Sequence, residues 1–523
     1  MKNDNVDERA PTVAEARAAV RAAARAAERC ADDWAAAEGH VAFRDVEAEL
    51  HELVLAFARA LVVLFLCLRE RAVMATWPDG ECVEAWGRSF RRAPAIARNL
   101  TTIFGVVRYW RTYMREVSGV DKQGFHPLDL SLGLPADRFS WTVLAKASWL
   151  ATKLSFAEAK ATMAAFMPNV PSTEVIERAV LGFGRFAEKW LQERPAPEDD
   201  GEVLVIMFDG KGIPTATDAE LARRRGRRKK KKPEASPRHR GRRKRKRSPK
   251  KPRRKKGDHS KNAKMATTVV MYTLSRRGTR RLEGPINKWI YASFAPKWWA
   301  FYIARKWADR RGFTKDSGRL VQVVTDGDND LADLCAAYFP EAEHTIDIWH
   351  VVERLWSAGE CFLPEGSQAL TRWVEEQKDR LFDGEIEDIL DEMRTRLAAI
   401  AKTGPGNKGR RERLGKAIAY IDKRADKLDY GSLRRRDLEI STGPIEGAIK
   451  HVIGKRQDHG GMRWIKERAE AVLKLRCIEV TGGWDAFERE LHDRRHRAGL
   501  VLKQRLRLQA NRPAGLPHML EAA

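Results

Sequence analysis

The stretch Val203-Leu-Val-Ile-Met-Phe208 is followed directly by Asp209, and a second apolar stretch, Leu320-Val-Gln-Val-Val-Thr325, is followed directly by Asp326. A glycine comes next in both cases. Short apolar runs rich in β-branched residues predict buried strands that end at these two aspartates. A carboxylate at the end of a buried strand is costly to desolvate unless a positive charge lies beside it. The two segments therefore predict a sheet that presents two acids, side by side, to a cation.

A third acid, Glu446, lies in Ser441-Thr-Gly-Pro-Ile-Glu-Gly447, where Thr442 is suited to cap a short helix and Pro444 suits its first turn. Mg²⁺ binds a few carboxylate oxygens and keeps several waters. Three acids from separate segments thus predict a site for two Mg²⁺ or Mn²⁺ ions, of the kind that cleaves phosphodiesters. Asp-Gly after a strand is also ordinary turn chemistry, so a turn or cap role for each acid stays open.

The charge of the chain is concentrated in one segment. The 523 residues carry a formal net charge of +26, and residues 223–256 hold 23 Lys and Arg against a single acid, Glu234. A basic segment favours an anionic partner, with nucleic acid the leading candidate. With no apolar residue larger than alanine, the segment cannot build a core. We expect a disordered loop that is inserted between two strands, or a flexible arm that binds phosphates, and the two descriptions are compatible.

Cysteine usage and the N-terminus indicate a cytoplasmic, nucleoid-associated protein. The six cysteines contain no C-x-x-C pair, which argues against a zinc finger and against a disulfide framework. The N-terminus is rich in acid and alanine, unlike a secretory signal. Residues 53–68 are very apolar, but they are few for a membrane span and include Arg59. A buried or dimer-forming helix is expected there, and no membrane partner.

Periodicity and linkers predict a mainly helical N-terminal half followed by a mixed α/β domain. Residues 13–96 show helical patterns, and residues 100–111 predict two strands around Gly105. Arg108 and Arg111 of this hairpin can contact a DNA backbone, or the hairpin can be a structural flap. The expected divisions are a helical region 1–96, a hairpin and helix-turn-helix-like DNA-binding region 97–195, the first part of the α/β domain 199–345 with the basic insert 223–256, a helical insertion 346–440, closing helices 441–490 and a basic tail 491–523. An ordinary helical hairpin is an equal alternative to the helix-turn-helix.

Several longer motifs are more specific than any single acid. They are Phe208-Asp-Gly-Lys-Gly212, Val324-Thr-Asp-Gly-Asp-Asn-Asp-Leu331, Ile346-Asp-Ile-Trp-His-Val351, Ser441-Thr-Gly-Pro-Ile-Glu-Gly447 and Gly454-Lys-Arg-Gln-Asp-His-Gly-Gly-Met-Arg-Trp464. Together they resemble bacterial insertion-sequence transposases of the DDE class, most closely the ISKra-type group, which is related to Mutator-like transposases. The resemblance covers about residues 40–490.

This resemblance implies an RNase H-like catalytic domain with a helical insertion, in which Asp209, Asp326 and Glu446 bind the metal ions. Asp347 and His350 match the Asp-x-x-His signature of the related transposases and are expected as accessory residues. A structural hydrogen bond is the alternative role for this pair. The long basic insert departs from the group, so the resemblance implies nothing for residues 213–262.

The function implied is a transposase that cleaves the terminal inverted repeats of an insertion sequence and joins the freed 3′-hydroxyl to target DNA. Its partners are double-stranded DNA and, on that DNA, further copies of the chain. Expected phosphate contacts are Lys211, Lys455, Arg456 and Arg463, each of which can instead be a solvated charge. Trp349, Trp356 and Trp464 can stack on an unpaired base or belong to the core. An RNase H-like nuclease without strand transfer, or a DNA-binding protein whose catalysis has decayed, remain alternatives.

Overall fold

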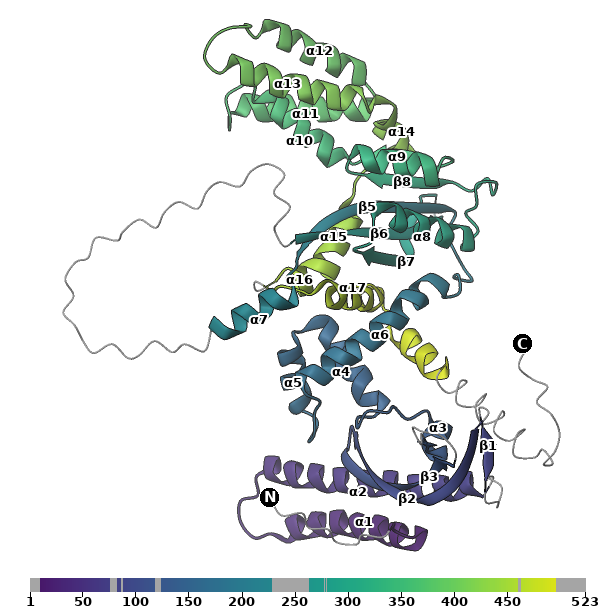
Figure 1. The fold of residues 1–523 in the computed structure, drawn as a ribbon. Helices are drawn as coiled ribbons and strands as arrows, with labels where there is room; N and C mark the ends of the chain where they lie inside the picture. Colours follow the sequence, from purple (N-terminus) through teal and green to yellow (C-terminus); the bar gives the residue numbers. More distant parts are fainter. Residues whose placement is uncertain are drawn as a thin grey trace, which may run out of the picture. The chain divides into compact units, whose positions relative to one another are not determined.

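The computed structural model describes residues 10–75, 82–85, 88–117, 124–227, 263–276, 278, 280–459 and 462–494 (Figure 1). Helices and two β-sheets give a mixed α/β fold, as expected. The chain forms two compact units: residues 1–182 with 484–523, and residues 183–483. The boundary falls within one helix, α6 (Thr173–Glu193).

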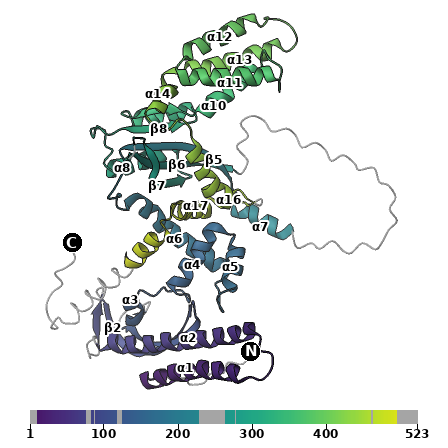
Figure 2. The same cartoon turned by 180° about the vertical axis from the view of Figure 1, so that it is seen from behind.

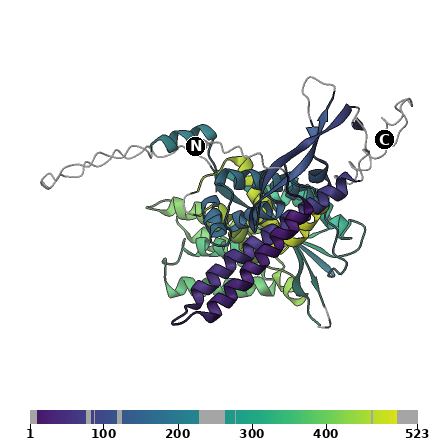
Figure 3. The same cartoon turned by 90° about the horizontal axis from the view of Figure 1, so that it is seen from below.

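The first unit begins with a helical hairpin. α1 (Val13–Ala36) starts with a capping box between Thr12 and Glu15, and it packs along α2 (Phe43–Met74), as Figure 3 shows from below. By length and composition, α2 is apolar enough to cross a membrane. Arg59, in its middle, donates a hydrogen bond to the carbonyl oxygen of Phe104 at 2.9 Å, so one side of the helix is tied to protein.

A four-stranded antiparallel sheet follows in the order β1-β2-β3-β4. Its strands are β1 (Val83–Ala85), β2 (Arg88–Thr102), β3 (Gly105–Glu116) and β4 (Gly124–Phe125). The hairpin expected over residues 100–111 is confirmed and is longer than expected. Its tight end requires Gly105, whose φ is +114°. The expectation of helix through residue 96 is wrong, because β2 already begins at Arg88. Its Pro94 obscured the strand and lies at a bulge in the ladder.

Helices complete the first unit. They are α3 (Pro127–Leu132), α4 (Trp141–Lys153), α5 (Phe156–Ala164) and the first part of α6. A capping box between Ser155 and Glu158 starts α5. A core cluster joins α2 to the hairpin and α3 through the side chains of Leu66, Leu100, Val107, Tyr109 and Leu128. The helix-turn-helix interpretation of α5 and α6 stays a prediction.

The second unit is built around a five-stranded mixed sheet in the order β7-β6-β5-β8-β9. The strands are β5 (Val203–Pro214), β6 (Ala263–Ser275), β7 (Glu283–Ser293), β8 (Val321–Thr325) and β9 (Glu343–Ile346). β5, β6 and β7 pair antiparallel, whereas β8 and β9 run parallel to β5. The sequence did not indicate β7, which contains Pro285 and a positive φ at Asn287, or the four-residue β9.

Helices pack on this sheet. α8 (Lys297–Arg310) packs on β6 and β7, α15 (Gly443–Ile449) on β5 and β6, and α17 (Lys466–Val480) on β7. The ring of Phe208 stacks on Phe301 of α8, with 3.7 Å between ring centroids. α9 (Asn329–Tyr338) follows β8. Between α15 and α17 lie a π-helical turn (Lys450–Gly454) and α16 (Lys455–Gln457).

The stretch Glu353–Asp437 is helical, as its composition predicted. It comprises most of α10 (Ile348–Gly359), then α11 (Gln368–Asp383), α12 (Ile386–Ala399), α13 (Asn407–Asp422), a 3₁₀ turn (Ala425–Lys427) and α14 (Tyr430–Arg435). α10 packs against α11 and α13, and α12 against α13 (Figure 2). In the sequence, these helices lie between β9 and α15 of the second unit.

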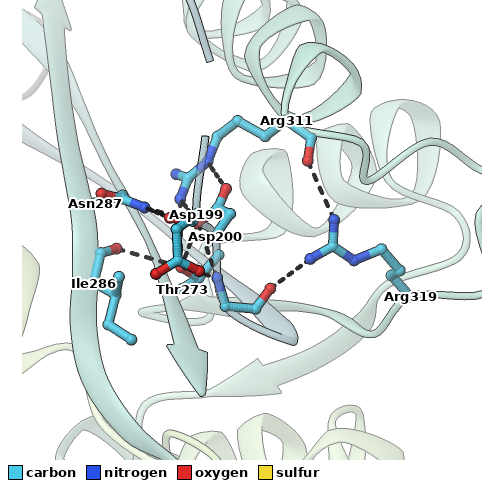
Figure 4. A network of polar contacts seen from close by, with 8 residues as sticks. Asp199, Asp200, Thr273, Ile286, Asn287, Arg311 and Arg319 are labelled. Atoms are coloured by element: carbon cyan, nitrogen blue, oxygen red, sulfur yellow. Dashed lines mark hydrogen bonds and ion pairs between the residues drawn. The ribbon is translucent and has the colours of Figure 1, made fainter. Parts of the chain in front are cut away.

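A polar network fixes the entry to β5 (Figure 4). Asp200 accepts hydrogen bonds from Nε and Nη2 of Arg311, both at 2.7 Å, and from the hydroxyl of Thr273 at 2.6 Å. Burial opposes ionisation of Asp200, but the bonds from Arg311 and Thr273 outweigh it and lower its pKa. The segment that leads into β5 therefore ends in a carboxylate that protein groups pair.

The basic segment lies mostly outside the described residues. α7 (Asp218–Arg227) continues the chain after β5, so the expectation of disorder is wrong for residues 223–227. Residues 228–262, which hold the rest of the expected arm, lie outside the described part, and so do residues 495–523 of the expected tail. Residues 491–494 end a helix that begins at residue 484.

Candidate metal centre

The register of the five-stranded sheet places three acids in one row. β5 and β8 are parallel, and continuing their register brings Asp209 level with Asp326. β8 and β9 are also parallel, and their register brings Asp347 level with Asp326. The sheet thus gathers residues that are more than a hundred positions apart in sequence.

One expectation about this row is wrong. The strand that carries Asp209 does not end there: β5 continues to Pro214, because β6 pairs with it along its whole length. The neighbouring β8 does end before Asp326. Asp209 therefore lies where its parallel neighbour stops, which leaves its side chain half-buried beside a free edge.

The faces of β5 explain how Glu446 reaches the row. Successive side chains of a strand point to opposite faces, and Phe208 packs on Phe301 of α8. Asp209 therefore points to the other face, where α15 packs on β5 and carries Glu446. Figure 1 shows α15 lying along β5. The side chain of Glu446 is exposed, and that of Asp326 is half-buried.

The three carboxylates act on one another electrostatically. Burial raises the pKa of Asp209 above its ordinary value, and the charges of Asp326 and Glu446 raise it further. A hydrogen bond from the backbone N–H of Gly210, at 2.5 Å, and the charge of His350 act in the opposite direction. Together these effects leave the pKa of Asp209 raised, so the repulsion among the carboxylates is compensated only in part.

The donor set suits a hard divalent cation. Throughout the described ranges, Asp209, Asp326 and Glu446 form no ion pair with a lysine or arginine, so their oxygens are available. Carboxylate oxygens are the ligands that Mg²⁺ and Mn²⁺ prefer. Within the same described residues, no three His, Cys, Asp or Glu side chains are close enough together to hold an ion as they stand. Repulsion between like charges favours such separation.

Asp347 joins the row to α15 rather than facing the other acids. Its side chain is fully buried, and it accepts a hydrogen bond from the Thr442 hydroxyl at 2.6 Å. It also caps α10 by accepting from the N–H of Trp349 at 3.1 Å. Thr442 was expected to cap α15, but its side chain makes no cap bond. It donates to Asp347 instead, at the residue that precedes the helix of Glu446.

The pair Asp347 and His350 is held only loosely. Nε2 of His350 lies 3.9 Å from Oδ2 of Asp347, and Nδ1 lies 3.3 Å from Oε2 of Glu353. The structural alternative thus accounts well for Asp347, whose bonds go to Thr442 and Trp349. His350 is the member of the pair whose charge acts on Asp209, so an accessory role fits His350 better.

The helical insertion holds the turn at Asp326. The hydroxyl of Tyr420, in α13, donates to the Asp326 carbonyl oxygen at 2.9 Å, and Arg424 donates to the Gly327 carbonyl oxygen at 2.6 Å. The guanidinium groups of Arg424 and Arg354 lie 4.1 and 4.9 Å from the Tyr420 ring centroid. Gly327 is required here, since its φ is +83° and a Cβ would lie 2.3 Å from the Tyr420 hydroxyl.

The expected phosphate contacts divide into exposed and enclosed side chains. Lys455 is exposed, whereas Lys211 pairs with Asp458 at 3.3 Å and Arg463 pairs with Glu220 at 3.5 Å. Arg456 is only 2% exposed and stacks on Trp464 at 4.6 Å. Its burial is the opposite of what a DNA contact needs, so this expectation is wrong for Arg456.

The hairpin arginines of the first unit also differ from each other. Arg108 is exposed and lies over the ring of Trp110 at 5.5 Å. Arg111 pairs with Asp129, which also pairs with Arg98 at 2.8 Å. Burial lowers the pKa of Arg111 to about 10. Arg111 thus serves the fold of the hairpin, and the structural alternative is the better description for it.

The three tryptophans considered for base stacking have different surroundings. Trp464 is buried and donates to the Gln457 carbonyl oxygen at 3.2 Å, so it belongs to the core. Trp356 is partly buried, and Trp349 is 56% exposed. Of these three, Trp349, one residue before His350, is the exposed one.

Sequence reasoning missed Tyr420, Arg424 and the role of Thr442. These residues lie in the charged helical stretch or at a helix start, and no local pattern marks them. A search of known protein families finds no match for this chain, and a search of curated proteins finds no significant relative. The function is therefore inferred from the residues themselves and from their arrangement.

Proposed function

We propose that the chain is a DNA transposase of the DDE class with an RNase H-like catalytic domain. The observation that carries this proposal is the electrostatic coupling of Asp209 to Asp326 and Glu446, none of which has a lysine or arginine partner among the described residues. The sheet order, three antiparallel strands followed by two parallel ones, supports the RNase H-like fold. The helices between β9 and α15 correspond to the insertion that the sequence resemblance implies.

Asp209, Asp326 and Glu446 would hold two Mg²⁺ or Mn²⁺ ions. When bound, such ions activate an attacking oxygen and stabilise a leaving oxygen. The half-buried position of Asp209 supports this role. Burial and the charges of Asp326 and Glu446 disfavour its ionised form, and a bound cation would offset this cost. Asp347 and Thr442 fix the start of the helix that carries Glu446, and Tyr420 and Arg424 fix the turn that carries Asp326.

The proposed reaction has two displacements at phosphorus. First, the oxygen of a water molecule bonds to the phosphorus at the end of the element, and the 3′ oxygen leaves and takes up a proton as the water gives one up. Next, this 3′-hydroxyl bonds to a target phosphorus and displaces the target's own 3′ oxygen, so the number of phosphodiesters is unchanged. No covalent link to the protein is formed, and no Ser or Tyr nucleophile is required.

Exposed groups of the second unit near the acids are proposed to contact the DNA. Lys455 lies on α16, a few residues beyond Glu446 in sequence, and a lysine there can pair with a phosphate. The open indole of Trp349 can stack on a base that is unpaired near the cut. The basic segment 223–256 is proposed to add contacts that are independent of sequence.

Asp326→Asn tests the metal site, with Asp328→Asn as its matched control. Asp328 is exposed, pairs with Lys297 at 2.7 Å and caps α9, and asparagine caps a helix as well. We expect Asp326→Asn to lower cleavage of DNA carrying the ends of the element at least about a thousandfold, while binding of those ends persists. The control is expected to stay within a few-fold of wild type.

Two outcomes would overturn parts of the proposal. Normal Mg²⁺-dependent cleavage by Asp326→Asn would remove Asp326 from the metal site. Cleavage by the wild-type protein without any joining to a target plasmid would identify a nuclease rather than a transposase. Joining is measured by the appearance of recombinant products on a gel.

A further inference from the structure

A glutamine lies in the interior of β8, the strand that leads to Asp326. Gln322 is fully buried between Val321 and Val323, in a strand whose residues are all buried. A buried side-chain amide costs free energy unless its N–H groups and its oxygen are hydrogen-bonded. Polar partners are therefore needed to offset the burial of Gln322.

The amide of Gln322 pairs with both backbone groups of Glu439. Its Nε2 donates to the Glu439 carbonyl oxygen at 2.6 Å, and its Oε1 accepts from the Glu439 N–H at 3.0 Å. Nε2 also donates to the hydroxyl oxygen of Thr345 at 3.1 Å. The hydroxyl of Tyr272, in β6, donates to the Glu439 carboxylate at 2.7 Å. The side chains of Tyr272, Gln322 and Thr345 together form the Glu439 clamp.

The clamp lies on the face of the sheet that carries the acids. Alternate residues of a strand share a face, so Gln322 and Asp326, four residues apart, point to the same side. The register places Tyr272 and Gln322 on either side of Val205. Asp209 follows Val205 by four residues as well. At about 3.3 Å per residue, the row of the clamp therefore lies roughly 13 Å along the strands from the row of the acids.

The connection between α14 and α15, residues 436–442, leads from the helical insertion to Glu446. The clamp holds it at Glu439, and the N–H of Ile348 donates to the carbonyl oxygen of Ile440 at 3.0 Å. α15 follows the connection directly and carries Glu446 in its first turn. Because the backbone hydrogen bonds of a helix make it move as one body, the place where the connection is fixed sets the place of Glu446.

We propose that Gln322 is a positioning residue for Glu446. By pairing with the backbone of Glu439, it fixes how far this third carboxylate stands from the other two acids. This role rests on the proposed function, in which the three acids hold metal ions together. One strand would then fix the second acid, Asp326, through its own backbone and the third through the side chain of Gln322. Loss of the amide would leave both backbone groups of Glu439 without this partner and would free the connection to shift.

Gln322→Met tests this role, with Gln377→Met as its matched control. Methionine has about the length of glutamine and stays buried, but it cannot replace the hydrogen bonds. Gln377 is also buried, and its amide bonds to Glu392 and Arg380 within the helical insertion. Both variants are expected to lower the unfolding temperature by a few degrees, whereas only Gln322→Met is expected to change the metal site.

The measurement is the binding of Mn²⁺ to the full-length protein without DNA, followed by the electron paramagnetic resonance signal of free Mn²⁺. Binding that Asp326→Asn lacks defines the site and separates it from weak binding by other acids. We expect Gln322→Met to raise the Mn²⁺ dissociation constant of the site roughly 5- to 50-fold, the worth of two hydrogen bonds. Gln377→Met is expected to leave this constant unchanged.

A double variant tests whether Gln322 acts through Glu446. Glu446→Gln is expected to weaken Mn²⁺ binding by itself. Adding Gln322→Met is then expected to weaken it no further, because two changes are not additive when one residue acts through the other. Tyr272→Phe removes only the bond to the Glu439 carboxylate and is expected to weaken binding by about 3-fold. It keeps the role testable should Gln322→Met not fold.

Hydrogen exchange of the Glu439 N–H gives a readout that needs no metal. This N–H is expected to exchange slowly in wild type and at least about tenfold faster in Gln322→Met. Free exchange in wild type would overturn the clamp. Unchanged Mn²⁺ affinity in Gln322→Met, or additive losses in the double variant, would overturn the positioning role and leave the proposed function standing. A wild type that binds no more Mn²⁺ than Asp326→Asn would instead overturn the metal site, and the positioning role with it.

Discussion

Two acids, Asp200 just before β5 and Asp209 within it, are in opposite circumstances. At the entry, Asp200 is 9% exposed and is paired with Arg311, whose side chain is fully buried. Six residues into the strand, Asp209 faces two further carboxylates and has no lysine or arginine partner in the described part of the chain. Burial, with the charges of Asp326 and Glu446, raises the pKa of Asp209, whereas the partners of Asp200 lower the pKa of that group.

The difference separates a carboxylate that protein groups pair from one that the proposed function assigns to a metal ion. A buried charge is tolerated when it is paired and hydrogen-bonded, and Asp200 satisfies this condition with protein groups alone. Under the proposed function, a bound cation would satisfy it for Asp209. Folded proteins keep such a cost where function needs it, which is why the proposed function assigns Asp209 and not Asp200 to the site.

The largest effect is expected from breaking the ion pair between Arg311 and Asp200. Arg311→Met leaves Asp200 buried without its partner and is expected to lower the free energy of unfolding by about 3–5 kcal/mol, measured by urea denaturation. The matched control is Arg276→Met, which removes an arginine from the exposed pair with Glu202 and is expected to cost less than about 1 kcal/mol. Equal losses for the two variants would contradict the structural role of Asp200.

An intermediate effect is expected from loosening the turn at Asp326. Tyr420→Phe removes the hydroxyl that donates to the Asp326 carbonyl oxygen and keeps the ring between its two arginines. We expect DNA cleavage to fall about 3- to 10-fold, the worth of one hydrogen bond, and the Mg²⁺ concentration for half-maximal cleavage to rise. Tyr302→Phe, on the exposed side of α8, is the control. A loss of activity without any change in Mg²⁺ requirement would mean that Tyr420 does not position Asp326.

The smallest effect is a gain of stability. The raised pKa of Asp209 means that its contribution to folding is present at acid pH and is lost as pH rises through the folded-state value. Asp209→Asn is therefore expected to raise the unfolding temperature of the metal-free protein slightly, and more at pH 8 than at pH 5. Added Mg²⁺ should stabilise wild type and not the variant. A variant less stable than wild type at pH 8 without metal would contradict the assignment of Asp209 as an unpaired charge.

Local sequence patterns predicted the elements that carry the site. The apolar run before Asp209 and the one before Asp326 became neighbouring strands, because burial on both faces demands an apolar run of this kind. The helical composition of residues 353–437 was equally informative. β9 was not predicted, since four residues with histidine and threonine give no hydrophobic period.

Contacts between distant segments could not be predicted. Arg456 looked like its basic neighbours in sequence, and only the packing of Trp464 shows that it is buried. Thr442 looked like a cap, but a stronger acceptor, the buried Asp347, takes its hydroxyl. The partner of Thr442 lies 95 positions away, outside the window that a local pattern covers. Trp464 lies in the same motif as Arg456, but no periodicity places its ring against the guanidinium.

The hydrogen bond from Tyr420 to the Asp326 turn has a consequence for how the protein is made. It joins residues that are 94 positions apart, and Glu446 comes later still. While the chain leaves the ribosome, the two site strands are complete long before the residues that set and finish the acidic cluster. If the proposed function holds, a nascent or truncated chain ending before residue 420 would lack a finished cutting site, so incomplete synthesis would yield an inert product rather than an uncontrolled nuclease.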